Sequence, residues 1–326
     1  MPYKNTILLG VVGDSAAGKT TLSTGIAGIL GEDRVTVICS DDYHRYNRKQ
    51  RKETGISALD PACNYVNIME QHFDLLRRGH PILKPIYNHS TGDFDPPEYI
   101  EPNEFVVIEG LLAYHTKAMR RNFDVKVYLA PEEELRTVWK IKRDITKRGY
   151  TEQEVRASLA KRVDDSRNFI RPQQPYADIV VSFYRPPRRV EETGPHLNAR
   201  LVLRPTLPHP DLSDVLERDA EDGRQMLTST ISREGGRLTE ILDINGQINQ
   251  MQTAQLEDVV WSHLPDLQHL RPEEMGKYIN GYLTSQSNPL ALTQLLITYH
   301  LLVAMQELQK DIAERKKWVE KYQLVT

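Results

Sequence analysis

Short apolar runs alternate with helical patterns through residues 1–190 of the chain. The apolar runs predict strands, and they are TILLGVV from Thr6, VTVIC from Val35, EFVVIEG from Glu104, FDVKVYLA from Phe123 and ADIVVSF from Ala177. Amphipathic periodicity between them predicts helices over 19–30, 67–79 and 131–149. This rhythm is typical of an α/β fold with a mostly parallel sheet flanked by helices.

Residues 191–326 show a different pattern, in which short β-like segments come first and helices follow. ARLVLRP from Ala199, MLTSTIS from Met226 and LTEILDI from Leu238 are punctuated by Gly235-Gly236 and Asn245-Gly246, which predict antiparallel hairpin turns. Helical patterns follow over 253–263, 272–284 and 289–322.

The join between the two patterns is a proline-rich stretch, YRPPRRVEETGP from Tyr184. It predicts a boundary between an α/β domain at 1–190 and a C-terminal α+β extension at 191–326. We expect the extension to pack on the sheet of the first domain, because its strand edge and long apolar stripe need a partner, and to support a homodimer.

Composition narrows the possible partners and compartment. The chain has 326 residues, 39% of them hydrophobic, and a net charge of −3, so no global basic field favours nucleic acid. It has neither an apolar run of about 18 residues nor a signal-peptide pattern at its start, which predicts a cytoplasmic protein without a membrane span. Two cysteines, Cys39 and Cys63, suggest neither a disulfide framework nor a zinc site.

A phosphate-binding motif follows the first predicted strand. GDSAAGKT from Gly13 fits G-x-x-x-x-G-K-[ST] in full and opens a predicted helix, which is the context this motif requires. Its backbone N–H groups and Lys19 can hold the phosphates of ATP, and the Thr20 hydroxyl can bind Mg²⁺. The predicted nucleotide contacts are Gly13, Asp14, Ser15, Ala16, Ala17, Gly18, Lys19, Thr20 and Thr21.

A second acidic group is needed to complete a metal site beside the P-loop. Glu109 comes directly after the apolar run FVVI, at the carboxyl end of a predicted strand, where open α/β sheets bind their ligands. Gly110 follows and allows close approach of the backbone to a ligand. We therefore predict Glu109 as the metal-side carboxylate rather than an ordinary surface acid.

The predicted helix at 131–149 carries cations along one side. Arg136, Lys140, Arg143 and Lys147 gather there, with Leu135, Val138, Ile141 and Ile145 on the other side. Such a stripe is often only a solvated face. Here a triphosphate must be neutralised during transfer, and this helix could close over it, so we favour a catalytic lid.

The stretch CSDDYHRYNRKQR from Cys39 follows the second predicted strand and therefore faces the phosphate from the acceptor side. Asp41 or Asp42 can accept the proton of an attacking hydroxyl. His44, Arg45 and Arg48 suit an anion better than a neutral nucleoside, because guanidinium groups match phosphate oxygens. The acceptor is therefore expected to carry a phosphate already.

These motifs, together with ALDP from Ala58, KPIYNHSTGDFDPPE from Lys84, FVVIEGLL from Phe105 and PQQPYAD from Pro172, resemble the phosphoribulokinase family. The likeness is to the longer plant, cyanobacterial and archaeal form and runs through most of the chain. Uridine and pantothenate kinases share the P-loop and the aspartate after the second strand, but not DDYHRYNR with YNHSTGDFD. The resemblance implies a P-loop fold and ribulose 5-phosphate as the acceptor.

The resemblance also assigns roles to single residues. It makes Asp41 the general base, with Asp42 beside it, and Glu109 the metal-side acid. It implies that His44 and Arg48 contact the sugar phosphate, and that Tyr87 and His89 help to place the acceptor. The groups that it implies act on the phosphates are Lys140, Arg143 and Arg148, clustered with Asp144.

The cysteines depart from the redox-regulated plant form of the family. There, a P-loop cysteine pairs with a cysteine at the position of Cys39, whereas the P-loop position here is Ala17 and Cys63 lies outside that pattern. The C-terminal cysteine pair of the plant form is missing as well. We therefore expect no thiol switch.

Two other functions remain open at this point. One is another small-molecule kinase, with a nucleoside or a different sugar phosphate as its acceptor. The other is a nucleotide-binding regulatory protein without turnover. The presence of Lys19, Asp41 and Glu109 argues against the second, since a protein without turnover has no physical need for all three.

Overall fold

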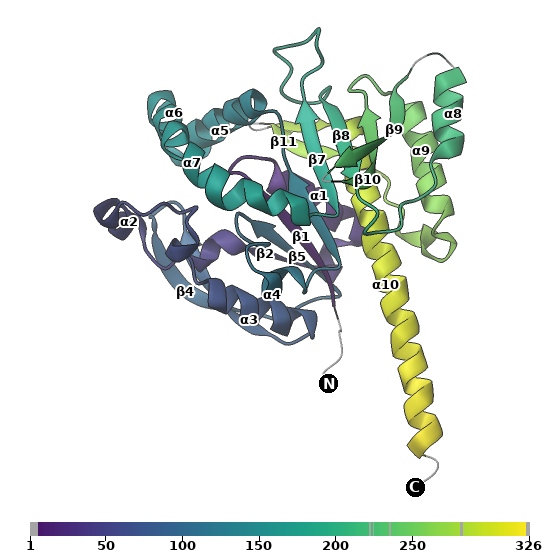
Figure 1. The fold of residues 1–326 in the computed structure, drawn as a ribbon, viewed down its shortest axis with the longest axis horizontal. Helices are drawn as coiled ribbons and strands as arrows, with labels where there is room; N and C mark the ends of the chain where they lie inside the picture. Colours follow the sequence, from purple (N-terminus) through teal and green to yellow (C-terminus); the bar gives the residue numbers. More distant parts are fainter. Residues whose placement is uncertain (1–5, 222, 224, 235, 281–282, 324–326) are drawn as a thin grey trace.

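The computed structural model describes residues 6–221, 223, 225–234, 236–280 and 283–323. Within them, eight strands form one mixed sheet that crosses the predicted boundary near residue 190 (Figure 1). The strand order is β2 (Val35–Cys39), β5 (Phe105–Gly110), β1 (Ile7–Gly13), β6 (Val125–Leu129), β7 (Ile179–Tyr184), β8 (Asn198–Leu203), β10 (Arg237–Ile244) and β9 (Leu227–Glu234).

The first five strands of this order are parallel, and the last three are antiparallel. β1 pairs in parallel with both β5 and β6, and β2 pairs in parallel with β5. The carboxyl ends of these strands therefore meet at one edge of the sheet, where loops can converge on a ligand. Beyond β7 the sheet continues through β8, β10 and β9, so the strands of the C-terminal extension lengthen the sheet itself.

Helices cover both faces of the sheet. The larger core joins one face to α1, α9 and α10, and the second core joins the other face to α3 and α4. This agrees with alternation along β1, whose Leu8 enters one core while Leu9 enters the other. The helices are α1 (Lys19–Leu30), α2 (Arg48–Thr54), α3 (Val66–Arg77), α4 (Lys117–Arg120), α5 (Glu133–Arg148), α6 (Glu152–Lys161), α7 (Val163–Asp165), α8 (Ser213–Glu221), α9 (Gln250–Ser262) and α10 (Asn288–Gln323).

The predicted strands and helices of the first 190 residues are all present, and most of those after it are too. The helix predicted over 272–284 is wrong: this segment holds an antiparallel pair, β11 (Lys277–Asn280) and β12 (Leu283–Gln286). The Asn245-Gly246 turn is not a hairpin turn, because it leads from β10 into α9. Gly235 lies outside the described residues, and Gly236 precedes β10 in the β9–β10 hairpin.

A second antiparallel pair was not predicted. β3 (Ile82–Asn88) and β4 (Asp93–Ile100) form a separate ribbon after α3. β4 is exposed along most of its length and carries two prolines, so its sequence lacks the alternation that predicts a half-buried strand. This ribbon matters because β3 carries Tyr87 toward the sheet edge described above.

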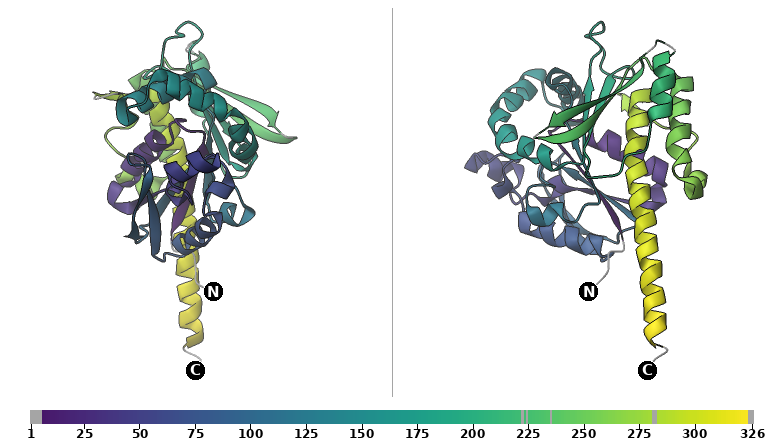
Figure 2. Two further views of the ribbon diagram at one scale, coloured as in Figure 1. Left: turned by 90° about the vertical axis from the view of Figure 1, so that its left-hand side faces the viewer. Right: turned by 45° about the vertical axis from the view of Figure 1, so that its right-hand side comes forward.

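The last helix, α10, has two parts of different character. Residues 288–317 are long and apolar enough to span a membrane by composition, but 83% of the apolar window is buried inside the protein. The apolar part packs against α1 and the sheet, as a core helix does. The charged part projects from the body of the molecule (Figures 1 and 2).

Candidate active site

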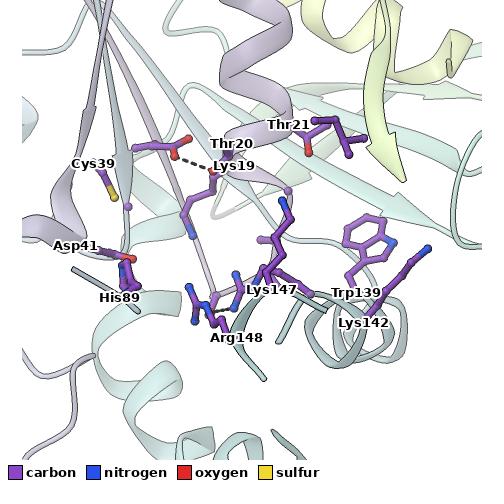
Figure 3. A pocket seen from close by; sticks show the side chains of 18 of the residues that line it. Lys19, Thr20, Thr21, Cys39, Asp41, His89, Trp139, Lys142, Lys147 and Arg148 are labelled. Atoms are coloured by element: carbon purple, nitrogen blue, oxygen red, sulfur yellow. Dashed lines mark hydrogen bonds between the residues drawn. The ribbon is translucent and has the colours of Figure 1, made fainter. Parts of the chain in front are cut away.

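A cavity of about 850 Å³ opens at the carboxyl edge of the parallel strands. Its walls come from the P-loop, the acceptor loop after β2, the end of β5, α5 and the β11–β12 hairpin. Figure 3 shows Asp41 and His89 on one side of Lys19, with Trp139 and Thr21 on the other. The predicted donor and acceptor residues thus meet in one space, although they are far apart in the sequence.

The P-loop has the backbone that its glycines predict. Gly18 takes a left-handed conformation (φ 95°) where the loop turns into α1, which residues other than glycine rarely adopt. The Lys19 Nζ atom donates to the carbonyl oxygens of Gly13 and Asp14 at 2.8 and 2.9 Å. Gly13 and Asp14 do not line the cavity, and the Asp14 carboxylate instead accepts from the Ser166 hydroxyl at 2.8 Å.

The two predicted metal ligands lie together. The Thr20 hydroxyl donates to Glu109 Oε1 at 2.8 Å, and the second oxygen, Oε2, is buried without a hydrogen-bond partner among the described residues. A hydroxyl and a carboxylate are oxygen ligands of the kind that Mg²⁺ prefers, so the buried, unpaired carboxylate oxygen fits the predicted metal site. No cluster of three or more His, Cys, Asp or Glu ligands occurs in the described part of the chain.

Gly110 allows the acceptor loop to lie close to Glu109. A Cβ atom at this position would lie 1.8 Å from the Ser40 hydroxyl, which is a clash. Ser40 begins the short 3₁₀ turn Ser40–Tyr43 that carries both aspartates of the acceptor loop. The glycine after Glu109 therefore holds the metal side and the acceptor side in contact.

The two aspartates of the acceptor loop have different surroundings. Asp42 forms an ion pair with the buried Lys84 at 2.5 Å and accepts from the Tyr87 backbone N–H at 3.1 Å. Asp41 lines the cavity, and its carboxylate has no hydrogen bond or ion pair among the described residues. Asp42 thus anchors β3, while Asp41 lies in the cavity without a protein partner, and this difference favours Asp41 as the predicted base.

His44 is buried and has a defined tautomer when neutral. Its Nδ1 atom lies 2.7 Å from Asn64 Oδ1, and the Asn64 amide nitrogen donates to the Asp60 carbonyl at 2.8 Å. Nδ1 therefore carries the proton, which leaves Nε2 as an acceptor. Burial lowers the pKa of His44, although nearby Asp41 opposes this. The resemblance implied that His44 contacts the sugar phosphate. A neutral His44 is suited to accept a hydrogen bond from a hydroxyl of that substrate and is less suited to bind its phosphate group.

Tyr87, His89 and Arg48 form one wall at the acceptor end. The Tyr87 ring packs edge-on against His44 and His89, at centroid distances of 4.8 and 5.0 Å. The Arg48 guanidinium donates to the His89 carbonyl, and Arg48 and His89 both line the cavity. Burial lowers the pKa of His89.

Two arginines at this end were missed as site residues. Arg51 Nη2 donates to the Tyr87 hydroxyl at 2.6 Å, and its guanidinium lies over the Tyr87 ring. Arg162 lines the cavity, and its guanidinium has no hydrogen bond or ion pair with any described residue. Burial and the charge of Arg51 lower the pKa of Arg162. Arg51 lies inside the acceptor stretch and could have been found there, whereas Arg162 follows α6 in a segment without a motif.

The cationic side of α5 lies against the P-loop. Arg136 donates to the Ser15 carbonyl at 2.9 Å, and Arg143 donates to the Ser15 hydroxyl at 3.2 Å. On the apolar side, Leu135 is fully buried, whereas Val138 and Ile145 are 39% and 42% exposed, and Val138 also lines the cavity. Arg136 and Arg143 therefore face the P-loop, which supports the predicted lid.

Lys140 is placed differently from the other α5 cations. Its Nζ atom is buried and bonds Asp144 at 2.8 Å, and it does not line the cavity. Burial lowers the pKa of Lys140 to about 8. Burial raises the pKa of Asp144, but Lys140 and Arg143 outweigh it and hold that pKa below its usual range. Asp144 also pairs with Arg143 and Arg148 at 2.8 and 3.5 Å, so Lys140 supports these two arginines from behind.

The chain is similar in sequence to known kinases. The family model described as "Phosphoribulokinase / Uridine kinase family" matches residues 8–188. A phosphoribulokinase of Synechocystis sp. is 44% identical over 197 residues, which are 60% of this chain and 59% of that protein. The chloroplastic phosphoribulokinase of Arabidopsis thaliana is 36% identical over 220 residues, covering 62% of this chain and 55% of that protein. The match thus spans little more than half of either relative.

Two further matches bear on the fold and on the alternative acceptor. A uridine kinase of Clostridium perfringens is 29% identical over 184 residues, which are 55% of this chain and 88% of that protein. The solved phosphoribulokinase of Rhodobacter spheroides superposes with a TM-score of 0.55 at 18% identity, covering 82% of this chain and 98% of that one. At this identity the likeness describes the fold alone.

Proposed function

The chain belongs to the phosphoribulokinase / uridine kinase family, and we propose that it transfers the γ-phosphate of ATP to the 1-hydroxyl of D-ribulose 5-phosphate. The observation that carries this proposal is the free Asp41 carboxylate, which shares the cavity with Lys19 and with Arg48, Arg51 and Arg162. A base alone suits any hydroxyl acceptor. A base surrounded by arginines suits a hydroxyl acceptor that is already an anion.

The reaction follows from these groups. Asp41 accepts the proton of the 1-hydroxyl as its oxygen attacks the γ-phosphorus. The bond from that phosphorus to the β–γ bridging oxygen breaks, and ADP leaves with the electron pair. Lys19 and Arg143 lie on the donor side and offset the charge on the transferred group, which is most of what a loose phosphoryl transition state requires.

Thr20 and Glu109 would hold Mg²⁺ together with the nucleotide phosphates. When bound, the ion neutralises charge on the β- and γ-phosphates. His44, with Nε2 as an acceptor, can orient a hydroxyl of the sugar beside Asp41. The arginines at the acceptor end hold the 5-phosphate, so both ends of the acceptor are positioned.

A coupled assay of ADP release tests the acceptor directly. We expect turnover with ribulose 5-phosphate, much less with ribose 5-phosphate, and none with uridine, which offers no anion to the arginines. Preference for uridine would overturn the proposal and favour the nucleoside kinase alternative, for which the 29% identical uridine kinase is a precedent. Binding of ATP without turnover on any acceptor would favour a regulatory protein.

We also expect the chain to act as a cytoplasmic homodimer that uses neither nucleic acid nor membrane. Support for the dimer comes from β9, which is the edge strand of the large sheet. Ile231 on β9 and Leu238 on β10 are 70% and 56% exposed, an apolar edge that a second copy would cover. Light scattering at micromolar concentration checks this, and monomer alone would contradict it.

A further inference from the structure

The end of the cavity opposite Asp41, where Trp139 and Thr21 lie, takes no part in the phosphoryl transfer described above. The γ-phosphate must face Asp41, because that is where the acceptor's hydroxyl is activated. The phosphate chain then runs past Lys19 along the P-loop, and the nucleoside must lie on the side of Gly18 and Thr21. Figure 3 shows Trp139 on that side, opposite Asp41.

Two aromatic side chains meet one short loop at this end. The Trp139 indole N–H donates to the Thr193 carbonyl at 2.9 Å. The Tyr278 hydroxyl lies so close to Gly194 that a Cβ there would be 2.6 Å from it. Consecutive loop residues thus hold one ring from α5 and one from β11. All four residues line the cavity.

The surroundings of the two rings suit a flat, mostly apolar group. A Cβ on Gly18 would lie 4.0 Å from the Trp139 ring, so the indole borders the P-loop at the start of α1. Leu197 and Leu290 contribute apolar surface to the same cavity. The Tyr278 hydroxyl is buried, and its polar neighbour is Ser285, directly opposite on β12, but it forms no hydrogen bond of normal geometry with a described residue, which leaves a polar group for a ligand.

We propose that this end binds the base of the donor nucleotide, with the Trp139 indole against the face of the base and the Tyr278 hydroxyl bonded to the nucleoside. The inference rests on the proposed function and assigns the donor specificity of that site. Thr193, Gly194 and Tyr278 lie outside the segment that matches the family, at residues 8–188. The C-terminal extension therefore completes the donor site and does more than lengthen the sheet.

Gln294 holds this end in register with the P-loop helix. It is fully buried on α10, donates to the Thr21 carbonyl at 3.2 Å and accepts from the Gly276 N–H at 3.2 Å. Gly276 directly precedes β11, so one side chain links α1, α10 and the hairpin that carries Tyr278. Gly25 makes room for it, since a Cβ there would lie 1.9 Å from the Gln294 amide.

Calorimetric titration of the full chain with Mg-ATP and with inorganic triphosphate separates the base from the phosphates. Trp139→Leu should weaken ATP about 5- to 100-fold, the usual range for stacking of a base on an aromatic ring. Tyr278→Phe keeps the ring and should weaken ATP about 2- to 10-fold through the lost hydrogen bond. Affinity for triphosphate should stay unchanged in both variants.

Tyr99→Ala is the control, because Tyr99 is an exposed aromatic residue on β4, outside the cavity. It should leave both affinities unchanged. The inference is overturned if ATP and triphosphate weaken equally, or if a folded Tyr278→Phe variant binds ATP as the wild type does. A wild-type chain that binds ATP but does not phosphorylate ribulose 5-phosphate would sink the proposed acceptor and leave the base site intact.

Discussion

The acceptor end and the base end of the cavity are built on different principles. The acceptor end collects charge: Asp41, His89, Arg51 and Arg162 face one another across a small volume. The base end is instead formed by the aromatic rings of Trp139 and Tyr278, which lie beside the backbone of the loop at Thr193 and Gly194. Charge fixes where a proton and a phosphate go, whereas shape fixes which nucleoside fits.

The two ends also differ in how many segments of the chain form them. Most charged groups of the acceptor end come from a single stretch after β2 and from the ribbon that Asp42 anchors to it. The base end needs α5, the loop at Thr193, β11 and α10 together. Changes at the acceptor end should therefore alter catalysis sharply, and the following predictions test this in order of expected effect.

The largest effect is expected at Asp41. Asp41→Asn removes the proton acceptor but keeps the side-chain volume, so kcat should fall roughly 10²- to 10⁴-fold while ATP affinity is kept. Steady-state kinetics and ATP titration measure the two quantities.

Asp42→Asn is the matched comparison. It leaves the buried Lys84 without its carboxylate, so the free energy of unfolding should drop by about 3–5 kcal/mol. Thermal unfolding measures this loss of stability. The kcat of the folded Asp42→Asn variant should be more than about 10-fold higher than that of Asp41→Asn, because only Asp41→Asn removes the general base. If Asp42→Asn abolishes kcat in the folded protein while Asp41→Asn leaves kcat unchanged, the assignment of the base is wrong.

The next effect is expected on the acceptor's affinity. Arg48→Ala should raise KM for ribulose 5-phosphate roughly 10- to 100-fold, the loss of one charge-assisted hydrogen bond, with little change in KM for ATP. Trp139→Leu should show the reverse pattern, which makes it the control from the other end. Equal changes in both KM values for Arg48→Ala would instead point to a structural defect.

A smaller effect concerns the alkaline side of the pH profile. Because burial lowers the pKa of Lys140 to about 8 from 10.5, this group loses its proton as pH rises through 8, and its ion pair with Asp144 is lost. Arg143 and Arg148 then lose support, so kcat should fall. The unfolded chain keeps the proton longer, so this group makes the free energy of unfolding rise with pH between about 8 and 10.5.

Lys140→Arg separates the two effects, because a guanidinium stays charged through this range. The alkaline limb of kcat should move to higher pH in this variant. An unchanged limb would assign it to another group.

The smallest effect is expected from oxidation. Both cysteines are free, and burial, with the charges of Asp41 and Asp42, raises the pKa of the Cys39 thiol well above its usual range. A thiol of this kind is a poor nucleophile. Activity after mild oxidant or dithiol should be the same, and a reversible loss that Cys39→Ser abolishes would contradict this.

The sequence by itself determined the parts whose physics is local. A P-loop needs glycines and a lysine at fixed spacing, and Glu109 needs only to follow a buried strand, so these residues could be placed without coordinates. β1, β5, β6 and β7 could be predicted as well, because most residues of their apolar runs are buried, whichever face they point to.

Only the tertiary structure decided between groups that look alike in sequence. Asp41 and Asp42 are adjacent and identical, and Lys84, which arrives from β3, makes one structural and leaves the other free. Lys140 and Arg143 belong to the same stripe, yet burial gives one a supporting role and the other a cavity position. The segment over 272–284 looked helical because strands gain their hydrogen bonds from a partner, and a pairing of this kind leaves little local trace in composition. For the same reason the base end could not be predicted from the sequence. Trp139, Thr193 and Tyr278 are far apart in the chain, and they come together only where α5, a loop and β11 meet.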